Sequence, residues 1–303
     1  MDASGPFQQQ FRADPTVALV PPVVTPIAPG PAHRAQFVIE LVGPRTLPAH
    51  AASVLLTSQW YQPLGRPELF CMSAADAGWR PLSNTSRGSY DSLALCWDVL
   101  SDQGSLSPAT GQQLLQVAEQ FAAQVNRRAM PMPAPADLSK AASTLTRIQE
   151  GLDIGISIVV LPRTDQVAEQ ELWTQCSRLG LQFGPTGSFE WRAAEHPSPL
   201  FQVTPIGDTE SFSLRGVQAG LVHQGITIGF NVPRCPAPLA ALDGALHSAD
   251  VIAAAIQGAP FDQDGRPLSA KVRDEMRREL NNGVQVLEEI GIKPGSSAAL
   301  KIF

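Results

Sequence analysis

The segment GITIGFNVP, residues 225–233, alternates between two kinds of side chain. Ile228, Phe230 and Val232 would lie on one face of a strand, whereas Thr227 and Gly229 would lie on the other. This alternation is typical of an antiparallel sheet that packs helices on one face and leaves its second face uncovered. The segment therefore predicts an α+β domain.

The surrounding sequence predicts the other elements of this domain. A last helix is expected from Ser269, as its N-cap, to about Ile290. Few helices separate the expected strands, which favours a mainly antiparallel sheet. The remaining expected strands lie at 154–160, 188–192 and 201–206, and the remaining helices at 168–179 and 239–256.

The first half of the chain repeats this order of elements. Short similar segments recur in the same order in both halves. Phe70 followed by Ala74-Ala75-Asp76 parallels Phe189 followed by Ala193-Ala194-Glu195. Residues 96–99 likewise parallel 229–232, and Leu138-Ser139 parallels Leu268-Ser269. Colinear echoes of this kind indicate two tandem copies of one α+β domain, at 35–150 and 151–295. The expected strands of the first copy lie at 37–42, 68–73 and 92–99, and its helices at 51–60, 110–126 and from Leu138.

The two ends of the chain are expected to lie outside these domains. Residues 1–34 are rich in proline, which favours an extended, disordered linker over a helix or a central strand. Residues 296–303 are expected to form a short C-terminal tail. No run approaches the ~20 apolar residues of a membrane span, and the N-terminus lacks the pattern of a signal peptide. The sequence as it stands is therefore expected to be soluble.

Composition and spacing argue against several classes of function. A net charge of −6 favours no nucleic-acid partner. The four cysteines are widely scattered, so they predict buried thiols in a cytoplasmic protein and no zinc site. The five histidines lie at no metal-ligand spacing, and no glycine pattern matches a phosphate-binding loop. Asp262 and Asp264 supply only part of a calcium loop and are expected in an ordinary turn. We expect no enzyme, no metal and no cofactor.

The second copy resembles the C-terminal domain of the ZipA family, which binds the cell-division protein FtsZ. The resemblance is carried by LGLQFG at 179–184, SPLFQV at 198–203, GITIGFNVP at 225–233, SADVIA at 248–253 and Leu268-Ser269. It implies a split β-α-β fold with an antiparallel sheet and helices on one face. The first copy shares the pattern more faintly.

The resemblance also implies a function. It predicts a non-enzymatic adaptor that binds the C-terminal peptide of FtsZ in an apolar groove on the exposed sheet face. The groove positions carried over are Ile154, Ile156, Phe189, Thr204, Ile206, Thr227 and Gly229. The first copy is expected either to hold a degenerate second site or to support the second copy.

Members of the family carry an N-terminal membrane span before a proline-rich linker. This sequence has the linker without a span, so it is expected either to lack the start of the natural protein or to be a soluble relative. The expected location is the cytoplasmic side of the division site. Two alternative functions remain: a small-molecule sensor with its site between the tandem domains, and a weakly active or inactive descendant of an enzyme.

Overall fold

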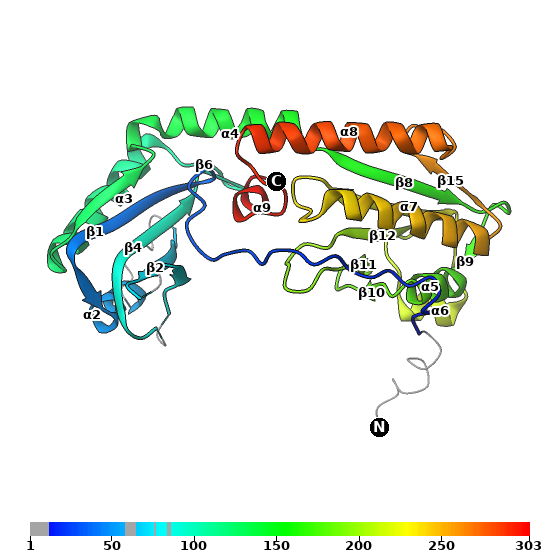
Figure 1. The fold of residues 1–303 in the computed structure, drawn as a ribbon, viewed down its shortest axis with the longest axis horizontal. Helices are drawn as coiled ribbons and strands as arrows, with labels where there is room; N and C mark the ends of the chain where they lie inside the picture. The colour runs from blue at the N-terminus through cyan, green and yellow to red at the C-terminus, as the bar shows by residue number, and fades with distance from the viewer. Residues whose placement is uncertain (1–11, 58–64, 76, 84–85) are drawn as a thin grey trace, which may run out of the picture. The chain divides into compact units, whose positions relative to one another are not determined.

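A computed structural model describes residues 12–57, 65–75, 77–83 and 86–303 of the protein (Figure 1). The chain divides into two compact units. The C-unit comprises Leu152–Ser296 with the described part of Met1–Pro26, and the N-unit comprises Ile27–Gly151 with Ser297–Phe303.

The C-unit is built on a six-stranded antiparallel sheet with the order β10-β11-β12-β14-β8-β15. A separate ladder pairs β9 (Val167–Ala168) with β13 (Val222–His223). The strands of the large sheet are β8 (Gly155–Leu161), β10 (Gln182–Phe183), β11 (Phe189–Trp191), β12 (Phe201–Ile206), β14 (Gly225–Asn231) and β15 (Ala259–Asp262).

Alternation along β14 divides the sheet into a helix-facing side and an outer side. Ile226 and Ile228 are fully buried, whereas Thr227 and Gly229 are only half-buried. The packing of α7 against β8, β14 and β15 places the helices on the buried side. The expected directions of these side chains are therefore confirmed. The helices of the unit are α5 (Glu169–Arg178), α6 (Leu214–Ala219), α7 (Pro238–Ala255) and α8 (Ala270–Glu289).

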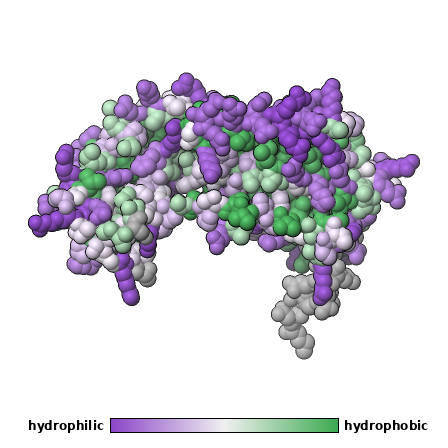
Figure 2. Space-filling view, viewed as in Figure 1, coloured by the Kyte–Doolittle hydropathy of each residue, from purple (hydrophilic) through white to green (hydrophobic). Residues whose placement is uncertain are grey.

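Helix α8 begins where the sequence predicts. The Ser269 side chain accepts a hydrogen bond from the Val272 N–H, which satisfies one of the donors left free at a helix start. Its buried stripe includes Val272, Met276 and Leu280. Hydrophilic side chains gather over the opposite side of this helix (Figure 2). This amphipathic pattern lets α8 cover the sheet beside α7.

The N-unit has a five-stranded antiparallel sheet with the order β3-β2-β4-β1-β7. Helices α2 and α3 pack against β1. Both units thus combine helices with antiparallel sheets, as an α+β fold requires. The strands are β1 (Gln36–Pro48), β2 (Glu68–Ser73), β3 (Trp79–Pro81), β4 (Ser89–Asp98), the small pair β5 (Leu100–Ser101) and β6 (Gly104–Ser105), and β7 (Arg128–Met132); the helices are α2 (Ala49–Thr57), α3 (Pro108–Gln124), the 3₁₀ turn η1 (Pro135–Asp137), α4 (Leu138–Leu152) and α9 (Ser297–Ile302).

The two sheets share one triplet of strands and differ outside it. The order β7-β1-β4 in the N-unit matches β15-β8-β14 in the C-unit. Beyond the triplet, β2 lies next to β4, whereas β12 separates β11 from β14. The echo between Phe70 and Phe189 therefore falls on strands with different neighbours. Duplication of one domain stays a hypothesis that the shared triplet supports.

The expected tails differ from the structure. Residues 14–19 pack on the C-unit, where the Leu19 N–H donates to the Leu179 carbonyl and Arg178 pairs with Asp14 at 2.8 Å. The C-terminal residues form α9 and belong to the N-unit. Both segments are ordered because they contact folded surfaces, which composition alone does not reveal. In the described part of the chain, no helix has the length and apolarity that crossing a membrane requires.

Gly295 closes the C-unit and offers a test of its packing. Its φ of +71° is in the left-handed region, and an added Cβ would overlap the backbone of Pro236. Gly295→Ala should lower the free energy of unfolding by about 2 kcal/mol or more. Gly265, with φ +75° and nothing within 4 Å of an added Cβ, is the matched control, and its change to alanine should cost about 1 kcal/mol. Urea unfolding measures both, and equal effects would contradict the assigned packing.

All four cysteines are free and buried, as the sequence predicts. Burial raises the pKa of Cys235 to about 12 and also raises the pKa of Cys96 and Cys176. These thiols therefore stay protonated, and the protein around them blocks reagents. Ellman's reagent at pH 8 should leave them unmodified in the folded protein and label them in guanidinium chloride. Fast labelling of the folded protein would contradict their burial.

Candidate functional site

The outer side of the C-unit sheet forms a continuous surface across four strands. Opposed residues in adjacent antiparallel strands point to the same side. The central row therefore runs Phe261, Val159, Thr227, Thr204 from β15 to β12. All four side chains are half-buried. Two apolar and two threonine side chains thus lie side by side, partly exposed, on the face opposite the helices.

Two further rows flank the central one. On one side, Leu161 and Ile206 lie on either side of Gly225. On the other side, Ser157 and Gln202 lie opposite Gly229. Strand β14 therefore contributes no side chain at two of its outer positions. A Cβ at Gly225 would overlap the Val160 carbonyl oxygen, so the backbone of the neighbouring strand requires glycine there.

The structure brings four of the seven sequence-predicted site residues together on this outer face. Thr204 pairs with Thr227 and Ile206 pairs with Gly225, while Gly229 lies one row away. Whether these residues bind a peptide stays a prediction at this point. The sequence missed Val159, Leu161 and Phe261, although the alternation along 225–231 could have identified their row once the pairing of strands was known.

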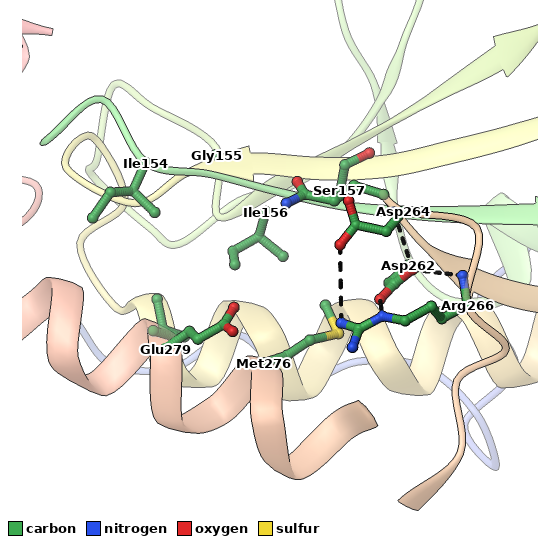
Figure 3. A pocket seen from close by; sticks show the side chains of 11 residues that line it. Ile154, Gly155, Ile156, Ser157, Asp262, Asp264, Arg266, Met276 and Glu279 are labelled. Atoms are coloured by element: carbon green, nitrogen blue, oxygen red, sulfur yellow. Dashed lines mark hydrogen bonds and ion pairs between the residues drawn. The ribbon is translucent and has the colours of Figure 1, made fainter. Parts of the chain in front are cut away.

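Ile154 and Ile156 point to the opposite side of the sheet, contrary to the sequence prediction. Figure 3 shows both side chains directed from the start of β8 toward α8. Ile156 opposes the buried Phe230, and a Cβ added to Gly283 of α8 would lie 2.7 Å from Ile154 Cδ1. These isoleucines help to attach α8 to the sheet and do not belong to the outer face.

The cavity in Figure 3 lies between these isoleucines, α8 and the turn after β15, and it measures about 150 Å³. Asp262, the last residue of β15, accepts a 2.7 Å hydrogen bond from Arg266 Nε and a second from the Asp264 N–H. Burial raises the pKa of Asp262, but the hydrogen bonds from Arg266 outweigh burial and lower it. Arg266 thus pairs with this carboxylate, and the Gly265 N–H donates to the Asp262 carbonyl to form the expected turn.

Phe189 also lies on the helix-facing side, so its assignment to the exposed face is wrong. It is 2% exposed and contacts three other aromatic rings, with centroids 4.9 Å from Trp173, 5.5 Å from Phe183 and 5.4 Å from Phe212. Ring pairs at these separations stabilise a core beyond simple burial. Phe189 therefore anchors β11 to α5 and to the loop before α6.

A buried pair of polar groups holds the same region together. His223 Nε2 lies 3.2 Å from Glu169 Oε2, and Glu169 Oε1 accepts the Ser213 N–H at 2.6 Å. Glu169 is fully buried and His223 is 2% exposed. Paired polar groups at such depth are costly to separate, so they fix the α6 segment relative to α5. The pair joins α5 to β13 and to the start of α6.

The aromatic cluster yields a stability prediction. Phe189→Ala should lower the free energy of unfolding by about 3–5 kcal/mol, because it opens a large cavity among buried rings. Phe183→Ala should cost less, because Phe183 is 46% exposed. Urea unfolding of both variants tests this ranking, and a larger effect of Phe183→Ala would contradict the placement of Phe189.

Comparison with known proteins identifies a family for most of the C-unit. Residues 154–279 match the family model described as ZipA, C-terminal FtsZ-binding domain. A search of the curated proteins found no match to the chain. The matched segment covers every strand of the large C-unit sheet and reaches the middle of α8. The family consists of protein-binding domains of cell division that bind FtsZ, and it is not a family of enzymes. Residues 154–279 are therefore a member of the ZipA C-terminal, FtsZ-binding domain family.

Proposed function

We propose that this protein is a non-enzymatic adaptor of the bacterial division site, and that the outer face of its C-unit sheet binds the C-terminal peptide of FtsZ. The family match supports FtsZ as the partner. The observation that supports the location is the row of Phe261, Val159, Thr227 and Thr204 across four strands. The alternative of a metabolite site between domains gains no support from the comparison.

The composition of the outer face suits a peptide with apolar side chains. Leu161 is 39% exposed, and Val159, Ile206 and Phe261 are half-buried. Partly exposed apolar side chains gain free energy when a partner covers them. Because the half-buried Gly229 adds no side chain above β14, a peptide side chain can approach the sheet backbone there, between Ser157 and Gln202.

Substitutions on the central row test the location. Thr227→Arg places a long charged side chain in the middle of the face, and Val159→Glu places a charge beside it. Each should weaken binding of a labelled FtsZ C-terminal peptide to the full chain at least ten-fold, equivalent to about 1.4 kcal/mol. Fluorescence anisotropy measures the change, against a wild-type Kd on the order of micromolar.

Val286→Glu is the matched control. Val286 is 41% exposed on α8, on the helix side of the sheet, so the same charge is introduced away from the outer face. It should leave the Kd unchanged. Equal weakening of peptide binding by all three variants, or no effect of the two outer-face variants, would contradict the proposed location. The absence of any binding by the wild-type chain would sink FtsZ as the partner.

A further inference from the structure

The outer side of the N-unit sheet is covered, in contrast to that of the C-unit. Val38, Ala94 and Cys96 form a buried cluster with at most 1% exposure, against which Phe70 and Trp79 pack. Pairing of Val38 with Cys96 and of Phe70 with Ala94 puts these side chains on one side of the sheet. The alternate residues Phe37, Ile39 and Leu41 occupy the other side, and α2 and α3 pack against their strand.

Two segments of the same unit cover this outer side. One consists of residues 30–33: a Cβ at Gly30 would lie 3.0 Å from Trp79 Cβ, and His33 Nε2 lies 3.8 Å from Glu40 Oε1. Glu40 opposes Ala94 and so shares its side of the sheet. Ala32, between them, is 5% exposed. The end of the proline-rich segment is thus part of the N-unit surface.

The second covering segment is α9, which is held by charge and by apolar burial. Lys301 Nζ lies 2.9 Å from Glu68 Oε1 and 3.0 Å from Asp98 Oδ1. Glu68 opposes Cys96 and Asp98 opposes Gln36, so both carboxylates lie on the outer side. The Gln36 amide donates to the same two carboxylates, at 2.9 and 3.0 Å. Gln36 therefore holds the two carboxylates that bind Lys301.

Two apolar residues beside Lys301 are buried as well. Ala299 is fully buried and Ile302 is 4% exposed, although the helix has only six residues. Such a short helix does not persist by itself in water, so its order comes from the surface on which it lies. Burial lowers the pKa of Lys301, but hydrogen bonds to Glu68 and Asp98 outweigh burial and raise it, so Lys301 is charged.

We infer that the outer side of the N-unit sheet is a peptide-binding surface for a short terminal helix with the pattern Ala299-Leu300-Lys301-Ile302, and that α9 of the same chain is its resident ligand. The pattern combines two apolar residues with one lysine read by Glu68 and Asp98. Because α9 is covalently attached, its effective concentration at the surface is on the order of millimolar. The surface is therefore filled in the intact chain. The contacts of α9 support this inference independently of FtsZ binding by the C-unit.

This arrangement makes the two sheets unequal. In the C-unit, the N-terminal segment lies on the helix side, since His247 Nε2 of α7 contacts the Val17 carbonyl at 3.0 Å and Arg178 of α5 pairs with Asp14. In the N-unit, residues 30–33 and α9 lie on the outer side. The intact chain consequently offers the outer face of its C-unit sheet, but not that of its N-unit sheet, to an external peptide.

The experiment is a titration of a labelled peptide of residues 296–303 into two forms of the chain. In a chain ending at Ser296 the surface is empty, so the peptide should bind saturably by fluorescence anisotropy. In the intact chain, binding should be at least ten-fold weaker. A peptide with Lys301→Glu should lose at least ten-fold in affinity for the truncated chain, and Asp98→Lys in that chain should restore part of the loss.

A second measurement covers the case in which the truncated chain does not fold. Hydrogen exchange of the intact Lys301→Glu variant should rise at least ten-fold over residues 297–303, while the strands β8 and β14 keep their protection. Lys293→Glu, another lysine near the C-terminus, should change neither region. A folded truncated chain that does not bind the peptide would overturn the inference, as would unchanged exchange in Lys301→Glu. Neither experiment uses FtsZ, so a negative result would count against the N-unit peptide surface and not against FtsZ binding by the C-unit.

Discussion

An antiparallel sheet has two faces, and whether its outer face is covered decides whether each unit of this protein can bind a partner there. Helices cover one face in both units, because residues such as Ile228 in β14 and Ile39 in β1 are fully buried and apolar. The outer face of the C-unit sheet carries half-buried Thr227 and Val159, and it remains accessible to a partner. The outer face of the N-unit sheet carries buried Val38 and Cys96, which require a cover. Residues 30–33 and α9 of the same unit lie on that side of the sheet.

Much of this architecture could be predicted because its sequence patterns are regular. The alternation in β14 identifies the two faces, and the stripe and the Ser269 cap of α8 fix its position within a residue. Strand β7 was missed because Pro131 suggests a break in the chain. It is an edge strand that pairs with β1 alone, and an edge strand tolerates the missing N–H of proline.

The site could be predicted only in part, because some strands carry no information about which way they face. In β8 the run Ile156, Ile158, Val159, Val160 is apolar on both sides, so alternation cannot choose between the two directions. Only its pairing with β14 shows that Val159 joins Thr227, whereas Ile156 joins Phe230. A shift by one residue exchanges the two faces completely, which is why the two isoleucines were misassigned. Phe189 lies in a three-residue strand that is too short to show any alternation.

The ends of the chain were the least predictable part, and their packing limits how the protein can be divided. Composition predicts that residues 1–34 form no helix or central strand, and the described residues 12–34 form none, but an extended segment can still pack against a folded surface. Residues 14–19 contact α5 and α7 of the C-unit, whereas α9 contacts the sheet of the N-unit. Each unit therefore contains a segment that lies beyond the other unit in sequence. Cleavage of the chain near residue 150 would place Asp14 and Arg178 on different fragments, and likewise Lys301 and Glu68. Each half would then expose a surface that is covered in the intact chain, so the binding properties of the C-unit have to be studied within the whole protein.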